Sequence, residues 1–238
     1  MFLKAIRMKE NPPEGYPYEL PLIQTFSEQK EITFEQPITF FAGENGSGKS
    51  TLLEAIAVAV GINPEGGSKY MVFSTFDSHS SLHEQLTLVR SGMIPTTSFF
   101  LRAENYYNFA SEIEALKVAT SYGERSLHAM SHGEGMLSII SQRFTEKGFY
   151  ILDEPESGLS VSRQMTLLKE VVALSQQGCQ FLIATHSPIL LAAPDATIYD
   201  VSEGELTKIA YQESRAFLDM QLFLNNPERM LHYLLDDT

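Results

Sequence analysis

Residues 43–51 combine the residue types and the spacing that bind phosphate groups. In order they are Gly43, Glu44, Asn45, Gly46, Ser47, Gly48, Lys49, Ser50 and Thr51. The string fits the spacing G-x-x-x-x-G-K-[ST], in which glycines let backbone N–H groups curl around anionic oxygens. Lys49 would reach the β- and γ-phosphates of a nucleoside triphosphate, and the Ser50 hydroxyl would coordinate Mg²⁺. We therefore expect this loop to bind a nucleotide.

A strand and a helix must hold such a loop in place. The apolar run 38–42 precedes it, and residues 52–60 continue as a helix-forming run. The N-terminus of that helix would aim its free N–H groups and the positive end of its dipole at the phosphates. A chance glycine-rich loop is the alternative interpretation, and the flanking strand and helix make it much the weaker one.

Two further groups of polar side chains follow apolar runs. Asp153 and Glu154 end the run 149–152. Asp153 would hold Mg²⁺ through water, and Glu154 would polarise the attacking water. Exposed turn acids are the weaker alternative. His186 follows the run 180–184, and we expect it to sense the γ-phosphate or to orient the attacking water.

A second candidate anion-binding turn opens the helix predicted over 136–144. Its residues are Ser131, Gly133 and Gly135. Serine and glycine are common at helix starts, so the turn alone is weak evidence, but its position just ahead of the acidic strand strengthens it. Glu104 ends a further apolar run, 97–103, where open α/β sheets place ligand contacts. A solvated turn explains Glu104 equally well.

Length and composition limit the class of protein. The chain has 238 residues, a formal net charge of -13 and one cysteine, Cys179. The charge argues against a broad basic face for nucleic acid, although a local patch of Lys and Arg is compatible with it. A single cysteine excludes an internal disulfide, and no apolar run reaches membrane-spanning length. We expect a cytoplasmic protein without membrane insertion.

Apolar periodicity and turn residues predict the remaining elements. Strands are predicted over 2–8, 22–26, 31–34, 38–42, 70–76, 97–103, 149–153 and 180–184, with a hairpin over 196–201 and 205–210. Helices are predicted over 78–91, 106–117, 136–144, 161–177 and 189–193, with a connector at 119–125, a docking helix from 214 and another after 227. Phe26 or Phe34 could stack on an adenine, but core packing is the favoured role for both rings.

Taken together, these motifs resemble those of the ATP-binding cassette ATPases. They are most similar to the soluble branch of the SMC, RecF and RecN type and to small stand-alone bacterial ATPases. Residues 43–51 match the Walker A loop, 131–135 the signature motif, 150–154 the Walker B strand, 157–160 the D-loop, and His186 the switch histidine. Two departures are visible. Met130 and His132 replace the usual signature residues, and Glu104 stands where the Q-loop glutamine is expected.

The resemblance implies a fold, a division of the chain and a mechanism. The fold would be α/β: a P-loop NTPase core with a mixed, mainly parallel sheet, an N-terminal antiparallel β layer and an inserted helical subdomain. One domain would span 1–238, with the β layer and Walker A loop in 1–60, a helical region with the signature in about 75–145, Walker B and the switch histidine in 146–212, and C-terminal helices in 213–238. ATP and Mg²⁺ would be bound, and Glu104 would be a metal contact.

The resemblance also implies an output. Two copies would stack head to tail when ATP binds, each signature turn closing on the ATP of the other copy, and hydrolysis would reopen the dimer. The preferred interpretation is a soluble switch acting on DNA or a partner protein. The alternative is the ATP-hydrolysing subunit of an ABC transporter. A small-molecule kinase ranks lowest, because that class does not need the signature turn or the D-loop.

Overall fold

The computed structural model describes residues 1–64, 66–68, 80–104, 111, 130–202 and 205–236. The strands are β1 Leu3–Met8, β2 Glu31–Thr33, β3 Ile38–Gly43, β4 Gly67–Ser68, β5 Leu86–Arg90, β6 Ser98–Arg102, β7 Phe149–Asp153, β8 Gln180–Ala184, β9 Ala196–Ser202 and β10 Glu205–Ile209. The α-helices are α1 Pro21–Gln29, α2 Lys49–Val60, α4 His132–Arg143, α5 Val161–Gln176, α6 Arg215–Asn225 and α7 Pro227–Asp236. Short 3₁₀ helices are η1 Ser81–Gln85, η4 Leu190–Ala192 and η5 Tyr211–Glu213.

These strands form two sheets. The larger has the order β10-β9-β3-β8-β7-β6-β4, and its pairs β9-β3, β3-β8, β8-β7 and β7-β6 are parallel, whereas β10-β9 and β4-β6 are antiparallel. The smaller sheet, β2-β1-β5, is antiparallel. The predicted P-loop NTPase-like α/β fold, with a mixed, mainly parallel sheet and a small antiparallel sheet, is confirmed.

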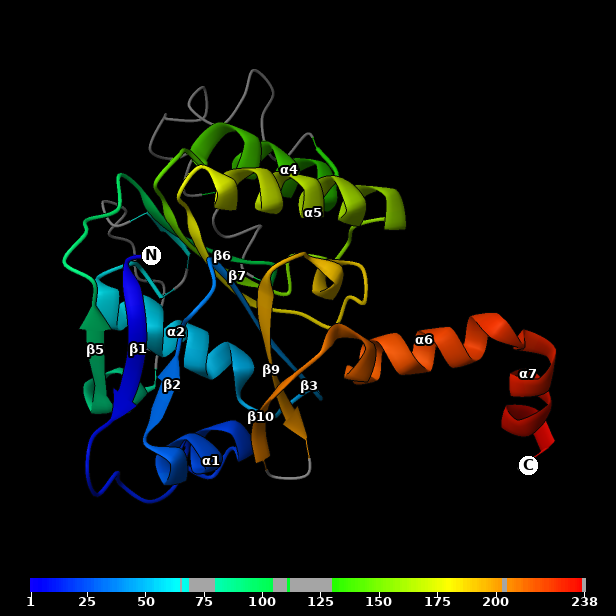
Figure 1. Cartoon of the computed structure of the whole chain (residues 1–238), viewed down its shortest axis with the longest axis horizontal. Coiled ribbons are helices and arrows are strands. Elements are labelled where there is room, and N and C mark those ends of the chain that lie inside the picture. The colour runs from blue at the N-terminus through cyan, green and yellow to red at the C-terminus, as the bar shows by residue number, and fades with distance from the viewer. Residues whose placement is uncertain (65, 69–79, 105–110, 112–129, 203–204, 237–238) are drawn as a thin grey trace.

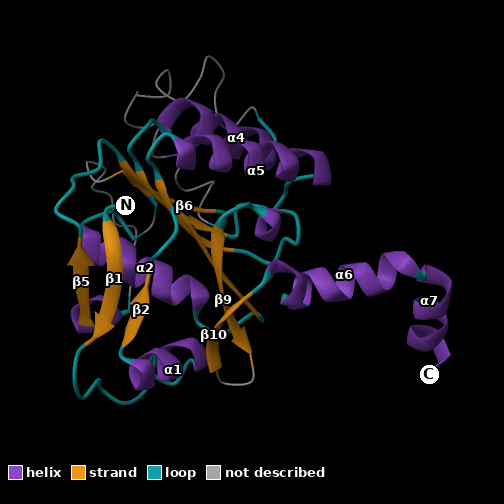
Figure 2. Cartoon of the chain, in the orientation of Figure 1, coloured by secondary structure: helices purple, strands orange, loops and turns teal. Residues whose placement is uncertain are grey.

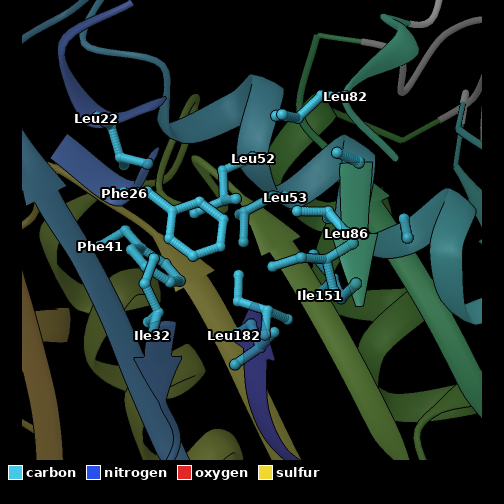
Figure 3. Packing of buried hydrophobic residues seen from close by; sticks show 14 of the residues in the cluster. Leu22, Phe26, Ile32, Phe41, Leu52, Leu53, Leu82, Leu86, Ile151 and Leu182 are labelled. Carbon is cyan, nitrogen blue, oxygen red and sulfur yellow. The ribbon is translucent and has the colours of Figure 1, made fainter. Parts of the chain in front are cut away.

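The large sheet separates two apolar layers. On one face, α4 and α5 pack on side chains such as Phe40 and Ile183. On the other face, α1, α2 and the small sheet enclose a second cluster around Phe41 and Leu182 (Figures 1 and 3). Consecutive residues of β3 and β8 thus point to opposite layers, as side chains in a strand must. Because both faces are covered, the central strands consist mainly of buried apolar residues.

The prediction of a strand over 22–26 is wrong, since these residues lie in α1. Pro21 begins the helix, and Leu22, Ile23 and Phe26 are buried on one of its faces, which is a helical spacing. Phe26 is 0% and Phe34 2% exposed. The favoured core role of both rings is therefore confirmed, and neither is available to stack on a base.

The prediction of a helix over 78–91 is also wrong in its described part. Residues 81–85 form η1, and residues 86–90 form β5, which pairs with β1. Pairing with the edge of β1 satisfies the backbone of this segment better than the weak helical pattern does. The strand predicted over 70–76, the connector over 119–125 and all of the 106–117 helix except Ser111 lie outside the described residues.

Gln180, at the start of β8, joins the two sheets. Its side chain is fully buried, and its Oε1 accepts hydrogen bonds from the N–H groups of Phe2 (2.7 Å) and Leu3 (2.9 Å). Its Nε2 donates to the Leu3 carbonyl at 2.7 Å. One side chain thus satisfies three backbone groups at the beginning of β1.

Replacing Gln180 with Leu is expected to destabilise the fold, because three buried backbone groups would lose their partners. The free energy of unfolding should fall by about 3 kcal/mol or more, as one unsatisfied buried group costs about 1–3 kcal/mol. Urea unfolding followed by circular dichroism measures this change. The exposed Gln176→Leu is the matched control, and equal effects of the two substitutions would contradict the assigned role.

The C-terminal helices form an arm that extends away from the sheets (Figures 1 and 2). The buried Ser214 caps α6 by accepting a hydrogen bond from the Phe217 N–H. Beyond it, large apolar side chains including Leu222 (57% exposed) and Leu235 (68%) face solvent. Both predicted helices are therefore present, and the docking predicted for the first of them stays a prediction. In the described part of the chain, no helix combines the length and the apolarity needed to span a membrane.

Candidate functional site

The loop between β3 and α2 has the backbone geometry of a phosphate cradle. Gly43 has φ 136° and Gly48, which caps α2, has φ 102°. Neither conformation suits a residue with a Cβ. A Cβ on Gly43 would also lie 2.8 Å from the Val201 carbonyl oxygen of the neighbouring strand β9. Only glycine therefore fits where the loop leaves the sheet, and the loop ends at a helix N-terminus, which attracts anions.

Lys49 is held inside this loop. Its side chain is buried, and Nζ donates hydrogen bonds to the carbonyls of Gly43 (2.9 Å) and Glu44 (2.7 Å). Burial lowers the pKa of Lys49, and the nearby carboxylates of Glu154 and Asp153 oppose that shift. The ammonium thus lies within the curl of the loop, where it can meet a phosphate that the loop encloses.

Ser50 and Asp153 meet beside the loop. The Ser50 hydroxyl donates to Asp153 Oδ1 at 2.9 Å, across 103 residues of sequence. Burial raises the pKa of Asp153 to about 6, while the Arg102 guanidinium and the Ser50 hydrogen bond act in the opposite direction. Two oxygen ligands at one point fit Mg²⁺, which in nucleotide sites takes one or two protein ligands and completes its shell with phosphate and water. The described residues contain no larger cluster of metal-ligating side chains.

Arg102 and Glu54 complete this corner and were missed in the sequence. Arg102 lies at the end of β6, with Nη1 2.9 Å from Glu54 Oε2 and Nε 3.2 Å from Asp153 Oδ2. Both side chains of the Arg102–Glu54 pair are largely buried, at 20% and 15% exposed. Glu54 follows Ser50 by one helical turn, so it faces the same side of α2. The sequence feature that could have identified Arg102 is a basic residue at the end of an apolar strand.

Arg102→Gln is expected to destabilise the fold in EDTA by about 3 kcal/mol, because it leaves Glu54 and Asp153 as buried acids without their cation. Chemical denaturation measures the change. Arg7→Gln is the matched control, since Arg7 pairs with Glu31 at 2.8 Å on the exposed surface, where loss of an ion pair costs less than about 1 kcal/mol. A smaller loss for Arg102→Gln than for Arg7→Gln would contradict this prediction.

Glu154 and His186 face each other at the ends of β7 and β8. Glu154 has φ 49°, an uncommon conformation for a residue with a side chain, and its N–H donates to the Ala184 carbonyl at 3.0 Å. Glu154 Oε1 lies 3.6 Å from His186 Nε2, too far for a hydrogen bond, and both side chains are 39% exposed. Glu156, also missed in the sequence, fixes the histidine backbone by accepting its N–H at 2.7 Å. Burial and the Lys49 charge lower the pKa of His186, which favours its neutral form.

The turn 131–135 is fastened to a different part of the chain. Ser131 caps α4 in a capping box with Glu134. Arg163 of α5 donates to Ser131 Oγ at 3.2 Å and to Glu134 Oε1 at 2.8 Å. A Cβ on Gly133 would lie 2.7 Å from Leu159 Cδ2 and 2.8 Å from the Gly158 carbonyl oxygen. Contacts among the described residues therefore tie this turn to loop 157–160 and α5 rather than to loop 43–51.

Three predicted site residues remain, and among the described contacts none of them hydrogen-bonds to the Ser50–Asp153 pair through a side chain: Glu104, Gly135 and Thr51. Glu104 is 78% exposed and lies 3.8 Å from Arg102 Nη2. Gly135 is buried in the first turn of α4. Thr51 follows Ser50 in α2 and is half-buried. The structure thus brings together the loop 43–51, Asp153, Glu154 and His186, with Glu104 at the margin and the turn 131–135 elsewhere.

Comparisons of the sequence with known proteins find ATPase families and ATP-binding relatives. A family model described as "AAA domain" matches residues 23–91, and one described as "AAA domain, putative AbiEii toxin, Type IV TA system" matches residues 75–192. An "Uncharacterized ABC transporter ATP-binding protein" of Haemophilus influenzae is 25% identical over 191 residues, which are 69% of this chain and 70% of the relative. The "Hemin import ATP-binding protein HmuV" of Idiomarina loihiensis is 27% identical over 60% of this chain and 63% of its own length.

A solved structure has the same fold. Its description is "An inward-facing conformation of a putative metal-chelate type ABC transporter", and it matches with a TM-score of 0.52 at 16% identity, covering 92% of this chain and 88% of the other. This similarity extends to the arrangement of helices and strands.

The alignment with the Idiomarina relative spans less than two thirds of that protein.

Proposed function

We propose that this chain, which is an ATPase of the AAA/ABC type, hydrolyses Mg²⁺-bound ATP in a site that two copies share. The observation that carries this proposal is that the Ser50–Asp153 pair and the turn 131–135 are held by different parts of the chain. Ser50 and Asp153 meet at 2.9 Å beside the phosphate loop, whereas Ser131 is fastened to Arg163 at 3.2 Å. A second copy, stacked head to tail, would place its own turn 131–135 against the phosphate loop of the first copy.

The side chains divide the chemistry among them. Loop N–H groups and Lys49 would bind the β- and γ-phosphates, and Lys49 would stabilise the charge that develops on the transferred phosphoryl group. Ser50 and Asp153 would hold Mg²⁺, which neutralises phosphate charge when bound. Glu154 would accept a proton from the attacking water. His186, kept neutral and anchored by Glu156, would orient that water or contact the γ-phosphate.

The turn 131–135 would contribute an anion-binding helix end. Ser131 caps α4, so the free N–H groups of the first turn of α4 and the serine hydroxyl can face a phosphate. Gly133 keeps the turn in contact with loop 157–160 of its own copy. Both loops would therefore approach the nucleotide of the second copy as one unit, and ATP would act as the bridge between the copies.

The relatives favour a transporter as the system that this ATPase drives. By their printed names, the Haemophilus relative is an ABC transporter ATP-binding protein and the Idiomarina relative is a hemin import ATP-binding protein. This supports the interpretation that the sequence analysis ranked second, an ATP-hydrolysing subunit that works with membrane components. The net charge of -13 weakens the interpretation that the chain acts on DNA. Membership of the SMC, RecF and RecN branch and a cytoplasmic location stay predictions.

The oligomeric state of the Glu154→Gln protein tests the shared site. Glutamine cannot accept the proton from water, so ATP should stay bound and hold the dimer closed. Size exclusion with light scattering should give a monomer without nucleotide or with MgADP and a dimer with MgATP. The Lys49→Ala, Glu154→Gln double variant, which lacks the phosphate contact, should stay monomeric. A monomer with ATP demonstrably bound would overturn the proposal.

A second experiment separates the two classes of partner. A transporter subunit should copurify with membrane proteins when the tagged chain is extracted in mild detergent. A protein that acts on DNA should instead hydrolyse ATP faster with DNA, and the stimulation should weaken as salt rises. Stimulation by DNA without membrane partners would restore the first interpretation of the sequence.

A further inference from the structure

A cavity of about 540 Å³ lies at the end of the sheet opposite the phosphate loop. Ser98 and Phe149 line it, and these residues begin the parallel strands β6 and β7. The phosphate loop, Asp153 and His186 instead follow the carboxyl ends of the parallel strands. The cavity therefore belongs to neither the nucleotide site nor its margin. Its volume falls in the range of pockets that bind small molecules.

The walls of the cavity are largely apolar. Phe2 directly precedes β1, Val60 ends α2, and Phe99 and Phe149 lie in the large sheet. Met93 and Ile94, in the connection between β5 and β6, add apolar side chains that are 54% and 88% exposed. Exposed apolar side chains beside an apolar cavity favour a ligand with an apolar body.

Two arginines supply the charged groups of the cavity. They are Arg90, at the end of β5, and Arg143, at the end of α4. No aspartate or glutamate is among the described lining residues, although the whole chain carries 30 acidic residues against 17 basic ones. Local positive charge in an acidic protein is selective for an anion.

Two threonines that line the cavity, Thr97 and Thr145, are already hydrogen-bonded. The Thr97 hydroxyl is 2.7 Å from the Tyr150 hydroxyl and 3.1 Å from the Thr145 hydroxyl. Arg90 makes one long hydrogen bond, from Nη2 to the Ala59 carbonyl at 3.5 Å. A guanidinium has five N–H donors in a planar fork, so most of those of Arg90 stay available for a carboxylate or a similar group.

We propose that this cavity binds a small amphipathic anion, with an apolar body against the apolar lining of the cavity and a carboxylate or sulfonate group on Arg90 and Arg143. The apolar walls would supply affinity, and the two arginines would select the charged end. The inference does not depend on the proposed function, because none of the residues that carry it lies in the nucleotide site.

Two fluorescent probes of nearly the same shape test this proposal. 8-Anilinonaphthalene-1-sulfonate carries one negative charge, and N-phenyl-1-naphthylamine is the same aromatic body without the sulfonate. The sulfonate probe should bind once per chain, and decanoate should displace it whereas MgATP should not. In Arg90→Gln and in Arg143→Gln its Kd should rise about tenfold, while the Kd of the neutral probe should change less than about twofold.

Two control variants distinguish loss of the anion contact from damage to the fold and from binding elsewhere on the chain. Arg90→Lys keeps the charge and should recover part of the affinity for the sulfonate probe, which a general loss of structure would not allow. Arg215→Gln removes an arginine from the exposed C-terminal arm and should leave binding unchanged. The proposal is overturned if Arg90→Gln and Arg143→Gln bind the sulfonate probe as tightly as the unmodified chain. Equal weakening by Arg215→Gln would place the probe on the arm and would overturn it too.

Discussion

Lys49→Ala is expected to lower kcat/KM for ATP hydrolysis by about 10³-fold or more. Its ammonium is buried inside the loop, where it makes hydrogen bonds of 2.9 and 2.7 Å to loop carbonyls. With ATP bound, these donors would turn to the phosphates. Loss of two charge-assisted hydrogen bonds, each about 1.5–3 kcal/mol, accounts for the size of the effect.

Steady-state phosphate release measures the rate, and titration with a fluorescent ATP analogue measures binding. Both should fall, because Lys49 would contact phosphate before and during the reaction. Lys169→Ala, on the exposed face of α5, is the control and should behave as the unmodified chain does. If Lys49→Ala binds nucleotide within threefold of the unmodified chain, the assigned role is wrong.

The fold could be predicted where the determinants are local. The loop 43–51 follows from glycines that alone fit φ 136° and 102°, and a buried parallel strand reads as a continuous apolar run. Local reasoning failed for residues 22–26 and 86–90. Short apolar segments fit a helix and a strand about equally well, and here Pro21 and the edge of β1 decide between the two.

Long-range contacts explain what the sequence did not reveal about the site. Arg102 reaches Asp153 because β6 pairs with β7, and Arg102 is the register partner of Asp153. Gln180 can be buried because its partners, Phe2 and Leu3, lie 178 and 177 positions earlier in the chain. Neither side chain belongs to a motif, so only the topology shows that these polar groups are satisfied. The C-terminal arm is another example, since its amphipathic pattern predicts helices but does not show that their apolar side chains stay exposed.

Gly133→Ala is expected to lower ATP hydrolysis about 100-fold while ATP binding to a single copy is unchanged. The new Cβ would lie 2.8 Å from the Gly158 carbonyl oxygen and 2.7 Å from Leu159 Cδ2. The turn or loop 157–160 must then move, and a displacement of about 1 Å in a catalytic group costs about 10²-fold in rate. ATP binding survives because loop 43–51 is untouched.

Mixing the Gly133→Ala and Lys49→Ala proteins then tests whether the turn 131–135 of one copy completes the site of the other. In a head-to-tail dimer, a mixed pair has one site in which an intact loop 43–51 meets an intact turn 131–135. Each mixed dimer has one intact site of two. Two nearly inactive proteins should together exceed the sum of their separate activities and regain at most about half of normal activity, provided that the sites work independently. Light scattering must show that mixed dimers form with MgATP. If they form and activity stays at the level of the separate variants, the turn and the loop act within one chain, and the separation of Ser131 from Ser50 is closed by a movement of α4 and α5 instead.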